Sequence, residues 1–221
     1  MPERAPESPA ELPKLSGGRL CLDFANTVEP RQGQPQRDQL RGYAELVRWA
    51  RHAGALDDVQ AQQLLTTPAS HQAAAQTSFD TAIALRETIY RAFAAIAQGA
   101  TPATADLDSM QRAYAAAMRH ARLRPTSGTA GQLAWTWGDD APDRVAPDRV
   151  WWPMARSAVE LATAGLPERV KQCPAPEGCG WLFLDTSKNR VRRWCSMQAC
   201  GSQAKARRQT ARRRAARAHA S

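Results

Sequence analysis

The chain has 221 residues, enough for one sizeable domain and one small module, and it carries a net charge of +9. The positive excess is confined to the C-terminal quarter, because residues 171–221 hold 12 basic and 2 acidic residues, whereas residues 1–170 hold 18 and 19. No run of eighteen apolar residues suggests a membrane span, so a membrane-spanning helix is not expected. A basic segment on a neutral chain is typical of a protein that binds a polyanion.

The first residues predict a disordered N-terminus. Residues 1–15 combine prolines and charges with few large apolar groups. They also lack the apolar core of a secretory signal peptide, so we expect a reducing, cytoplasmic location.

The first apolar string is predicted to be extended, because apolar residues alternate over 20–24, as in a short strand or an extended lead-in. Asp23 and Asn26 follow this pattern closely and could form a polar pair in a ligand pocket. The simpler interpretation is capping, since Asp and Asn commonly end extended segments and start helices.

Helices are predicted over most of the N-terminal domain. Asp38 is expected to cap a helix through about Ala53, and Asp57 or its neighbour a short helix through Leu65. Further helices are predicted over residues 67–97, 103–123 and 150–164, and a strand over residues 133–137. The chain contains no Gly-x-Ser-x-Gly, phosphate-loop, dinucleotide or His-Glu-x-x-His motif, and we therefore do not expect an enzyme.

Four cysteines in the last quarter have the spacing of metal ligands. Cys173 and Cys179 form a C-x5-C pair, Cys195 and Cys200 form a C-x4-C pair, and fifteen residues separate the pairs. Structural zinc sites fill a tetrahedron with four protein ligands, often four thiolates, so we predict one structural Zn²⁺. Two disulfides or four unrelated thiols are the alternatives. Disulfide frameworks belong mainly to small secreted chains, which favours zinc here.

The residues around the two pairs suit a metal knuckle. Proline and glycine surround the first pair, and Ser196 is suited to cap a helix that would start just after Cys195. A strand beginning at Val170 is expected to lead into Cys173. The aromatic residues of this segment are expected to build a small apolar core around the metal rather than stack on bases; they are Trp181, Phe183 and Trp194.

The segment after the second pair is rich in alanine and arginine and predicts a basic helix. A solvated tail or an electrostatic membrane anchor are the alternatives, but the tail offers mainly alanine opposite its charges. We expect the helix to become ordered when it binds a phosphate backbone. Its affinity for nucleic acid should fall as the salt concentration rises. The predicted nucleic-acid contacts are Arg192, Arg193, Lys205, Arg207, Arg208 and Arg212.

Two motifs in this order resemble a known family. The run from Cys179 to Ser187, followed by Arg-Arg-Trp-Cys-Ser-Met at 192–197 and Cys-Gly at 200–201, resembles the CGNR zinc finger of bacterial transcription regulators. In that family the finger follows an ABATE domain, whose opening string is similar to residues 20–27, LCLDFANT. The resemblance covers about residues 16–213. It implies that the four cysteines are zinc ligands and that the finger binds DNA in a bacterial, nucleoid-associated protein.

One departure from the family pattern concerns the motif that names the finger. The chain has Ser202-Gln203 where the family has Asn-Arg. The zinc ligand and the glycine before them are retained. Loss of a cation at position 203 would weaken a phosphate contact, for which Lys205 and Arg207 could compensate.

The sequence thus predicts a mainly α protein of two domains. Residues 16–166 form a helical, ABATE-like domain with a small β element, residues 167–213 a four-cysteine zinc finger, and residues 214–221 a basic tail. The expected function is transcription regulation through double-stranded DNA, with the N-terminal domain sensing a small-molecule effector or forming a homodimer. The alternatives are an enzyme with a pocket around Asp23 and Asn26, or an RNA-binding protein, each with a purely structural zinc.

Overall fold

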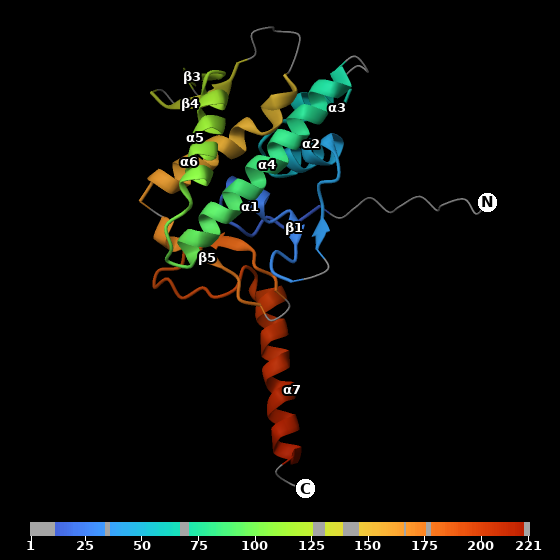
Figure 1. The fold of residues 1–221 in the computed structure, drawn as a ribbon, viewed down its shortest axis with the longest axis vertical. Coiled ribbons are helices and arrows are strands. Elements are labelled where there is room, and N and C mark those ends of the chain that lie inside the picture. The colour runs from blue at the N-terminus through green and yellow to red at the C-terminus, as the bar shows by residue number, and fades with distance from the viewer. Residues whose placement is uncertain are drawn as a thin grey trace, which may run out of the picture.

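The computed structural model of the chain describes residues 12–33, 36–66, 71–125, 131–138, 146–165, 167–175 and 178–218, with side chains described to residue 213. The described part is mainly helical, as predicted, and a single long helix projects from its body (Figure 1). Most of the predicted disordered segment and the predicted helix start at Thr67-Pro68 lie outside the described residues.

The body contains six of the helices: α1 (Leu20–Ala25), α2 (Tyr43–His52), α3 (Asp58–Leu65), α4 (Gln72–Ala97), α5 (Thr104–Met118) and α6 (Trp152–Thr163). The projecting helix is α7 (Ser202–Ala218). The strands form three antiparallel pairs: β1 (Val28–Glu29) with β2 (Arg37–Asp38), β3 (Ala121–Pro125) with β4 (Leu133–Trp137), and β5 (Val170–Gln172) with β6 (Leu182–Leu184).

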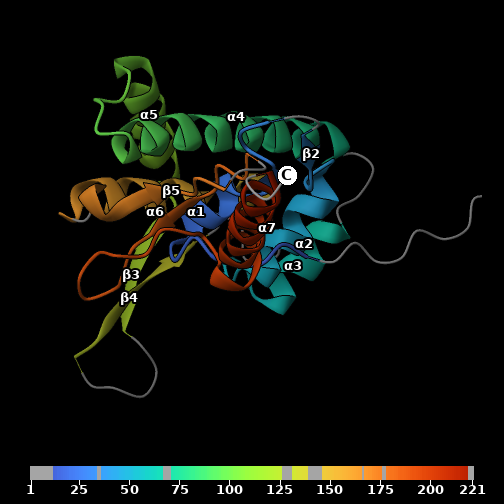
Figure 2. The ribbon, with the colours of Figure 1, turned by 90° about the horizontal axis from the view of Figure 1, so that it is seen from below.

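One apolar core unites the helices of the body. The long helix α4 crosses it, with α5 and α6 on one side and α2 and α3 on the other (Figures 1 and 2). Phe24, Trp49 and Trp152 are among its largest fully buried side chains. Burial of a side chain of this size contributes roughly 1.5–3 kcal/mol, so this packing dominates the stability of the body.

The segment predicted to be extended is instead the short helix α1. Its residues Cys21, Leu22, Phe24 and Ala25 are all buried, because α1 lies between α4, α6 and β6. The two half-buried residues of α1, Leu20 and Asp23, lie one helical turn apart, but one is apolar and the other polar, so the sequence shows no polar face that would separate a helix from a strand.

Two of the predicted helix boundaries depend on contacts distant in sequence. Asp38 does not cap α2, whose N-cap is Gly42; Asp38 instead lies in β2 and forms an ion pair of 2.6 Å with Arg86 of α4. The helix predicted to reach residue 123 ends at Met118, because residues 121–125 pair with β4. The capping prediction for Asp57 is confirmed, since it accepts the Gln60 N–H over 2.8 Å.

The strand predicted over residues 133–137 and the strand beginning at Val170 are also confirmed. None of the described helices is both long and apolar enough to cross a membrane.

Candidate metal centre and basic helix

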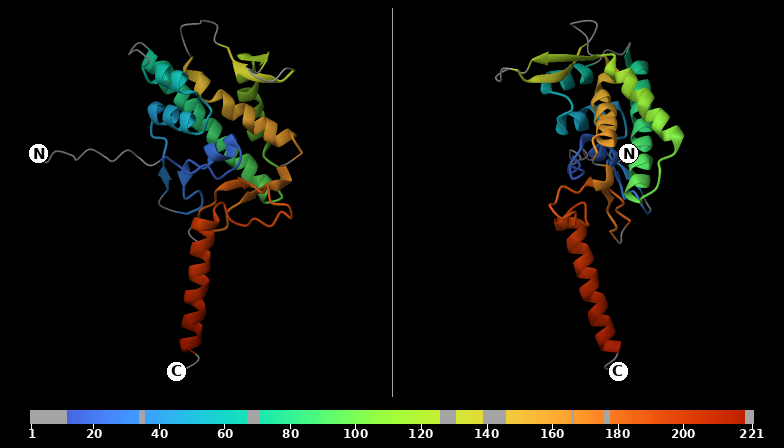
Figure 3. Two further views of the ribbon diagram at one scale, coloured as in Figure 1. Left: turned by 180° about the vertical axis from the view of Figure 1, so that it is seen from behind. Right: turned by 90° about the vertical axis from the view of Figure 1, so that its left-hand side faces the viewer.

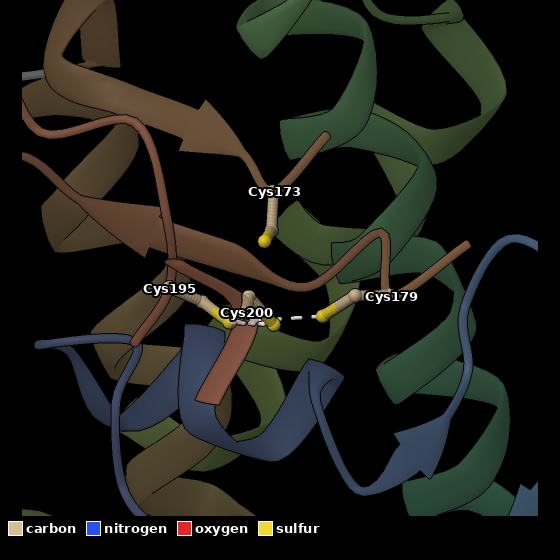
Figure 4. A group of neighbouring side chains, drawn as sticks. All are labelled: Cys173, Cys179, Cys195 and Cys200. Carbon is tan, nitrogen blue, oxygen red and sulfur yellow. Dashed lines mark hydrogen bonds between the residues drawn. The ribbon is translucent and has the colours of Figure 1, made fainter. Parts of the chain in front are cut away.

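The four cysteines of the C-terminal segment meet at one point. All four Sγ atoms lie within 4.8 Å of one another, and two of the separations, Cys179–Cys195 and Cys195–Cys200, are 3.6 Å. Figure 4 shows the side chains converging from the end of β5, the loop before β6 and the turn before α7. Zn–S bonds of about 2.3 Å place sulfur atoms about 3.8 Å apart in a tetrahedron. The separations therefore fit one zinc ion and are too long for disulfide bonds of about 2.05 Å.

The chemistry of the donor set also fits a divalent cation. Hydrogen bonds from Cys179 and Cys195 lower the pKa of the Cys173 thiol, while the contact with Cys173 raises the pKa of Cys195. Clustered thiols thus favour a single thiolate, because further ionisation brings like charges together. Zinc supplies the positive charge that allows all four to ionise and bind.

Strand β6 joins the metal centre to the helical body. Its side chains alternate: Leu182 and Leu184 enter the core of the helices, while Phe183 faces the cysteines. All three are at most 2% exposed, so both faces of the strand are buried. Trp181 and the partly buried Trp194 complete the apolar shell around the sulfurs, as predicted.

The first cysteine loop is pressed against the chain that follows β1. The N–H groups of Arg31 and Gln32 donate to the carbonyls of Cys179 and Gly178, over 2.8 and 2.7 Å. Gly178 has a φ of +75°, and a Cβ there would lie 1.4 Å from the Gln32 carbonyl oxygen. Only glycine fits this turn, because any side chain would separate the loop from the body.

A buried carboxylate shapes the loop between the two cysteine pairs. Asp185 is fully buried and accepts hydrogen bonds from Lys171 Nζ over 2.6 Å, from Ser187 Oγ over 2.6 Å and from the Arg192 N–H over 3.1 Å. Burial alone would raise the pKa of Asp185, but these partners lower it below its usual range. The sequence analysis did not single out Asp185 or Lys171, since neither is a metal ligand or a surface cation.

The basic helix α7 begins directly at the metal centre. Ser196 Oγ caps the turn Met197–Gly201 by accepting the Ala199 N–H over 3.2 Å, as predicted, and Cys200 lies within that turn. From residue 202 to residue 213 only Ala204 is buried. Figures 1 and 3 show α7 extending away from the body along its whole length.

Comparison with known protein families decides the family. The profile of the ABATE family, described as "Putative stress-induced transcription regulator", matches residues 18–165, and that of the CGNR zinc finger matches residues 169–213. The chain belongs to the ABATE family. None of the curated proteins compared with the chain matches it. The CGNR match and the four converging sulfurs together identify a site for one zinc ion, as predicted.

The ABATE and CGNR segments share one core. Besides Leu182 and Leu184, the core of the ABATE helices contains Val170 of β5. Tyr90 of α4 donates its hydroxyl to the Gly180 carbonyl over 3.2 Å, and Trp181 Nε1 donates to the Val28 carbonyl over 3.0 Å. The finger is therefore built into the ABATE domain rather than tethered to it by a linker.

The two residues considered for a ligand pocket make contacts within the protein. Asn26 is 2% exposed, and its side-chain amide donates to the Leu182 carbonyl and accepts the Leu182 N–H, both over 2.8 Å. Asp23 accepts the Gly17 N–H over 2.7 Å, and burial raises its pKa to about 6. The Asn26 side chain thus makes the backbone hydrogen bonds that a neighbouring strand would make with Leu182 of β6. Asp23 stabilises the turn before α1.

Removal of the Asn26 amide should destabilise the whole chain. In Asn26→Ala the N–H and carbonyl of Leu182 lose their partners in a buried place, which we expect to lower the free energy of unfolding by about 2–5 kcal/mol. Urea denaturation followed by circular dichroism measures this change. Asn189→Ala, an exposed asparagine of the same finger, is the control and should change stability by less than about 0.5 kcal/mol. Equal effects of the two substitutions would contradict the pairing role of Asn26.

Arg192 and Arg193 were predicted as nucleic-acid contacts before the second cysteine pair. The guanidinium of Arg192 is hydrogen-bonded to the backbone of the protein instead. It donates to the carbonyls of Cys195 over 2.5 Å and Trp194 over 3.0 Å, and also to those of Leu184 and Ser16. It also lies 4.5 Å from the centre of the Phe183 ring. The structure therefore uses Arg192 to hold the loop that carries Cys195. Arg193 is exposed beside Trp194.

The replaced family motif lies at the start of α7. Ser202 and Gln203 are both exposed, and Ser202 Oγ donates to the Met197 carbonyl over 3.1 Å. The hydroxyl thus supports the turn around Cys200. Lys205 and Arg207, the residues expected to compensate for the missing arginine, are exposed one turn further along.

Proposed function

We propose that this ABATE-family protein binds double-stranded DNA through α7 and regulates transcription by doing so, acting as a binding protein rather than an enzyme. The observation that carries the proposal is the helix itself: seventeen residues without an acidic side chain, exposed apart from Ala204 over the described side chains, and projecting from the body. The family description as a transcription regulator supports the same function.

The shape of α7 suits a duplex. A single α-helix fits the major groove of B-form DNA, and seventeen residues give a length of about 25 Å. Recognition of single-stranded RNA generally uses exposed aromatic side chains. The aromatic residues nearest the metal, Trp181 and Phe183, are buried instead, which favours duplex DNA as the partner.

The charge of α7 also requires a partner. Most of the stability of a protein helix comes from packing of an apolar face, and α7 buries only Ala204 among its described side chains. Arg208 and Arg212 are four residues apart, and like charges at this spacing weaken a helix by a few tenths of a kcal/mol. Phosphates placed along the helix convert this repulsion into attraction, so binding and stabilisation of α7 should occur together.

The zinc centre fixes the direction of α7. Cys195 and Cys200 lie on either side of the Ser196 cap, and the Gly201 N–H donates to the Ser196 carbonyl over 3.0 Å. Zinc held by the four cysteines would tie the first turn of the helix to Cys173 after β5 and to Cys179 in the loop before β6. In this proposal the helical ABATE domain supplies effector sensing or dimerisation in the cytoplasm, beside the bacterial nucleoid.

The test is a titration of the zinc-loaded protein against a fluorescent random-sequence duplex, with fluorescence anisotropy as the readout. Four exposed cations of α7 are counted as phosphate contacts: Lys205, Arg208, Arg212 and Arg213. If each neutralises about one phosphate, the slope of log affinity against log salt should be about −3 to −4.

A hairpin RNA of equal length is the comparison in the same experiment. We expect the duplex DNA to bind more tightly at every salt concentration. An affinity that does not change with salt concentration would contradict the proposed phosphate contacts. Tighter binding of the hairpin would indicate that RNA, rather than DNA, is the partner.

A further inference from the structure

An open groove of about 1240 Å³ lies beside the metal centre. It is lined by residues 12–16, by the start of α2 and by residues of the CGNR finger. Leu40, Trp49 and Trp181 are buried side chains of its lining. One wall consists of residues from the metal centre and from the turn that starts α7: Cys179, Cys195, Ser196, Ala199 and Cys200.

Three buried polar atoms without a hydrogen-bond partner among the described residues belong to the lining of this groove. They are Ser16 Oγ, Gln39 Oε1 and Trp49 Nε1. Trp49 is fully buried, so its indole N–H has lost water as a partner and gained none from the described protein. An unpaired buried donor or acceptor costs roughly 1–3 kcal/mol, and native proteins contain few of them. Three in the lining of one groove indicate a site built for a ligand.

The charges at the rim indicate the sign of that ligand. Lys14, Arg37 and Arg41 are exposed lining residues without an ion pair in the described part of the chain, and Glu29 is the one acidic lining residue there that also lacks one. The two remaining acidic side chains of the lining are already in ion pairs. The rim therefore carries an excess of positive charge above an apolar lining.

We propose that this groove is a binding site for a small organic anion with an apolar body of about the size of two or three rings. An acceptor atom of the anion takes the Trp49 N–H, and a donor reaches Gln39 Oε1. Its negative group lies among Lys14, Arg37 and Arg41, and its body packs on Leu40 and Trp181. The bound anion then contacts the turn that starts α7. The binding itself does not depend on the DNA-binding function proposed above.

The probe for this site is 8-anilinonaphthalene-1-sulfonate, a fluorescent ring compound with one anionic group and one N–H donor. The zinc-loaded full chain is titrated without nucleic acid, so failure of the DNA proposal would leave the result standing. We expect one saturable site per chain. Trp49→Phe, and separately Arg37→Gln with Arg41→Gln, should each weaken binding about tenfold or more, because each removes a hydrogen bond or ion pair to the probe.

Two controls make the test specific. Trp135→Phe, and separately Arg122→Gln with Arg124→Gln, repeat these substitutions on the β3–β4 hairpin, away from the groove, and should leave the dissociation constant unchanged. Probe-free Trp49→Phe should keep a single cooperative melting transition, lowered only by the cavity that the smaller ring leaves in the core. The proposal is overturned if the groove variants bind the probe as tightly as the controls.

Discussion

Loss of the zinc ion should unfold the CGNR finger and weaken the ABATE domain with it. Binding of structural zinc contributes apparent free energies of about 10–16 kcal/mol in small zinc fingers, more than most single domains have in total. Because β6 inserts Leu182 and Leu184 into the helical core, release of the cysteines should also release these side chains. The expected result is a broadened thermal transition of the whole chain at lower temperature, rather than loss of the finger alone.

The measurement compares Cys195→Ala with Cys21→Ala. Both substitutions remove one buried thiol, but Cys21 lies in the helical core apart from the metal centre. Metal analysis should give about one zinc per chain for Cys21→Ala and much less for Cys195→Ala. Near-ultraviolet circular dichroism should lose the signal of Trp181 and Trp194 only in Cys195→Ala. If chelation removes zinc and the helices melt as before, the shared core does not couple the two segments.

Neutralisation of one face of α7 should weaken duplex binding by about 100- to 1000-fold. Lys205, Arg208 and Arg212 recur at helical spacing and are exposed. At about 1–1.4 kcal/mol for each solvent-exposed phosphate contact, loss of three contacts costs about 3–4 kcal/mol, which corresponds to this change in affinity. The salt slope should become shallower by about 3. Substitution by glutamine keeps the helix, since glutamine, lysine and arginine have similar helix propensities.

The matched control removes the same charge elsewhere. Arg112, Arg119 and Arg124 are exposed residues of α5, its C-cap and β3. Figure 1 places β3 at the end of the body away from α7. The triple glutamine variant of these arginines should bind duplex DNA within about threefold of the natural chain. A comparable loss in both triple variants would show that net charge, rather than α7, determines the affinity.

The metal centre was predictable from the sequence because its ligands are local. Each of the two short cysteine loops can bring two sulfur atoms to one ion. The two pairs together supply all four ligands of a tetrahedral zinc site, so no residue from elsewhere in the chain is needed. The cap at Ser196 and the alanine-rich basic helix are equally local, since helix propensity and capping act within a few residues. The long periodic segments of α4 and α6 also follow from their own apolar spacing.

The roles of individual polar side chains were not predictable in this way. Arg192 lies in a basic stretch that is typical of phosphate contacts, yet its guanidinium donates hydrogen bonds to four backbone carbonyls. Asp38 has the signature of a helix cap, yet Arg86 from α4 binds it. A charged side chain pairs with whatever partner the fold brings near it, and these partners are distant along the chain.

The sequence by itself determined the zinc ligands, the basic helix and most of the helices, because each depends on neighbours within a few turns. Only the tertiary structure decided that Asn26 pairs with Leu182, 156 residues away, and that β6 is buried on both faces. It likewise decided where the Trp49 N–H lies, which has no hydrogen-bond partner among the described residues. The reason is that one apolar core closed over both segments, and the identity of the surfaces that meet in a core is a property of the whole packed chain.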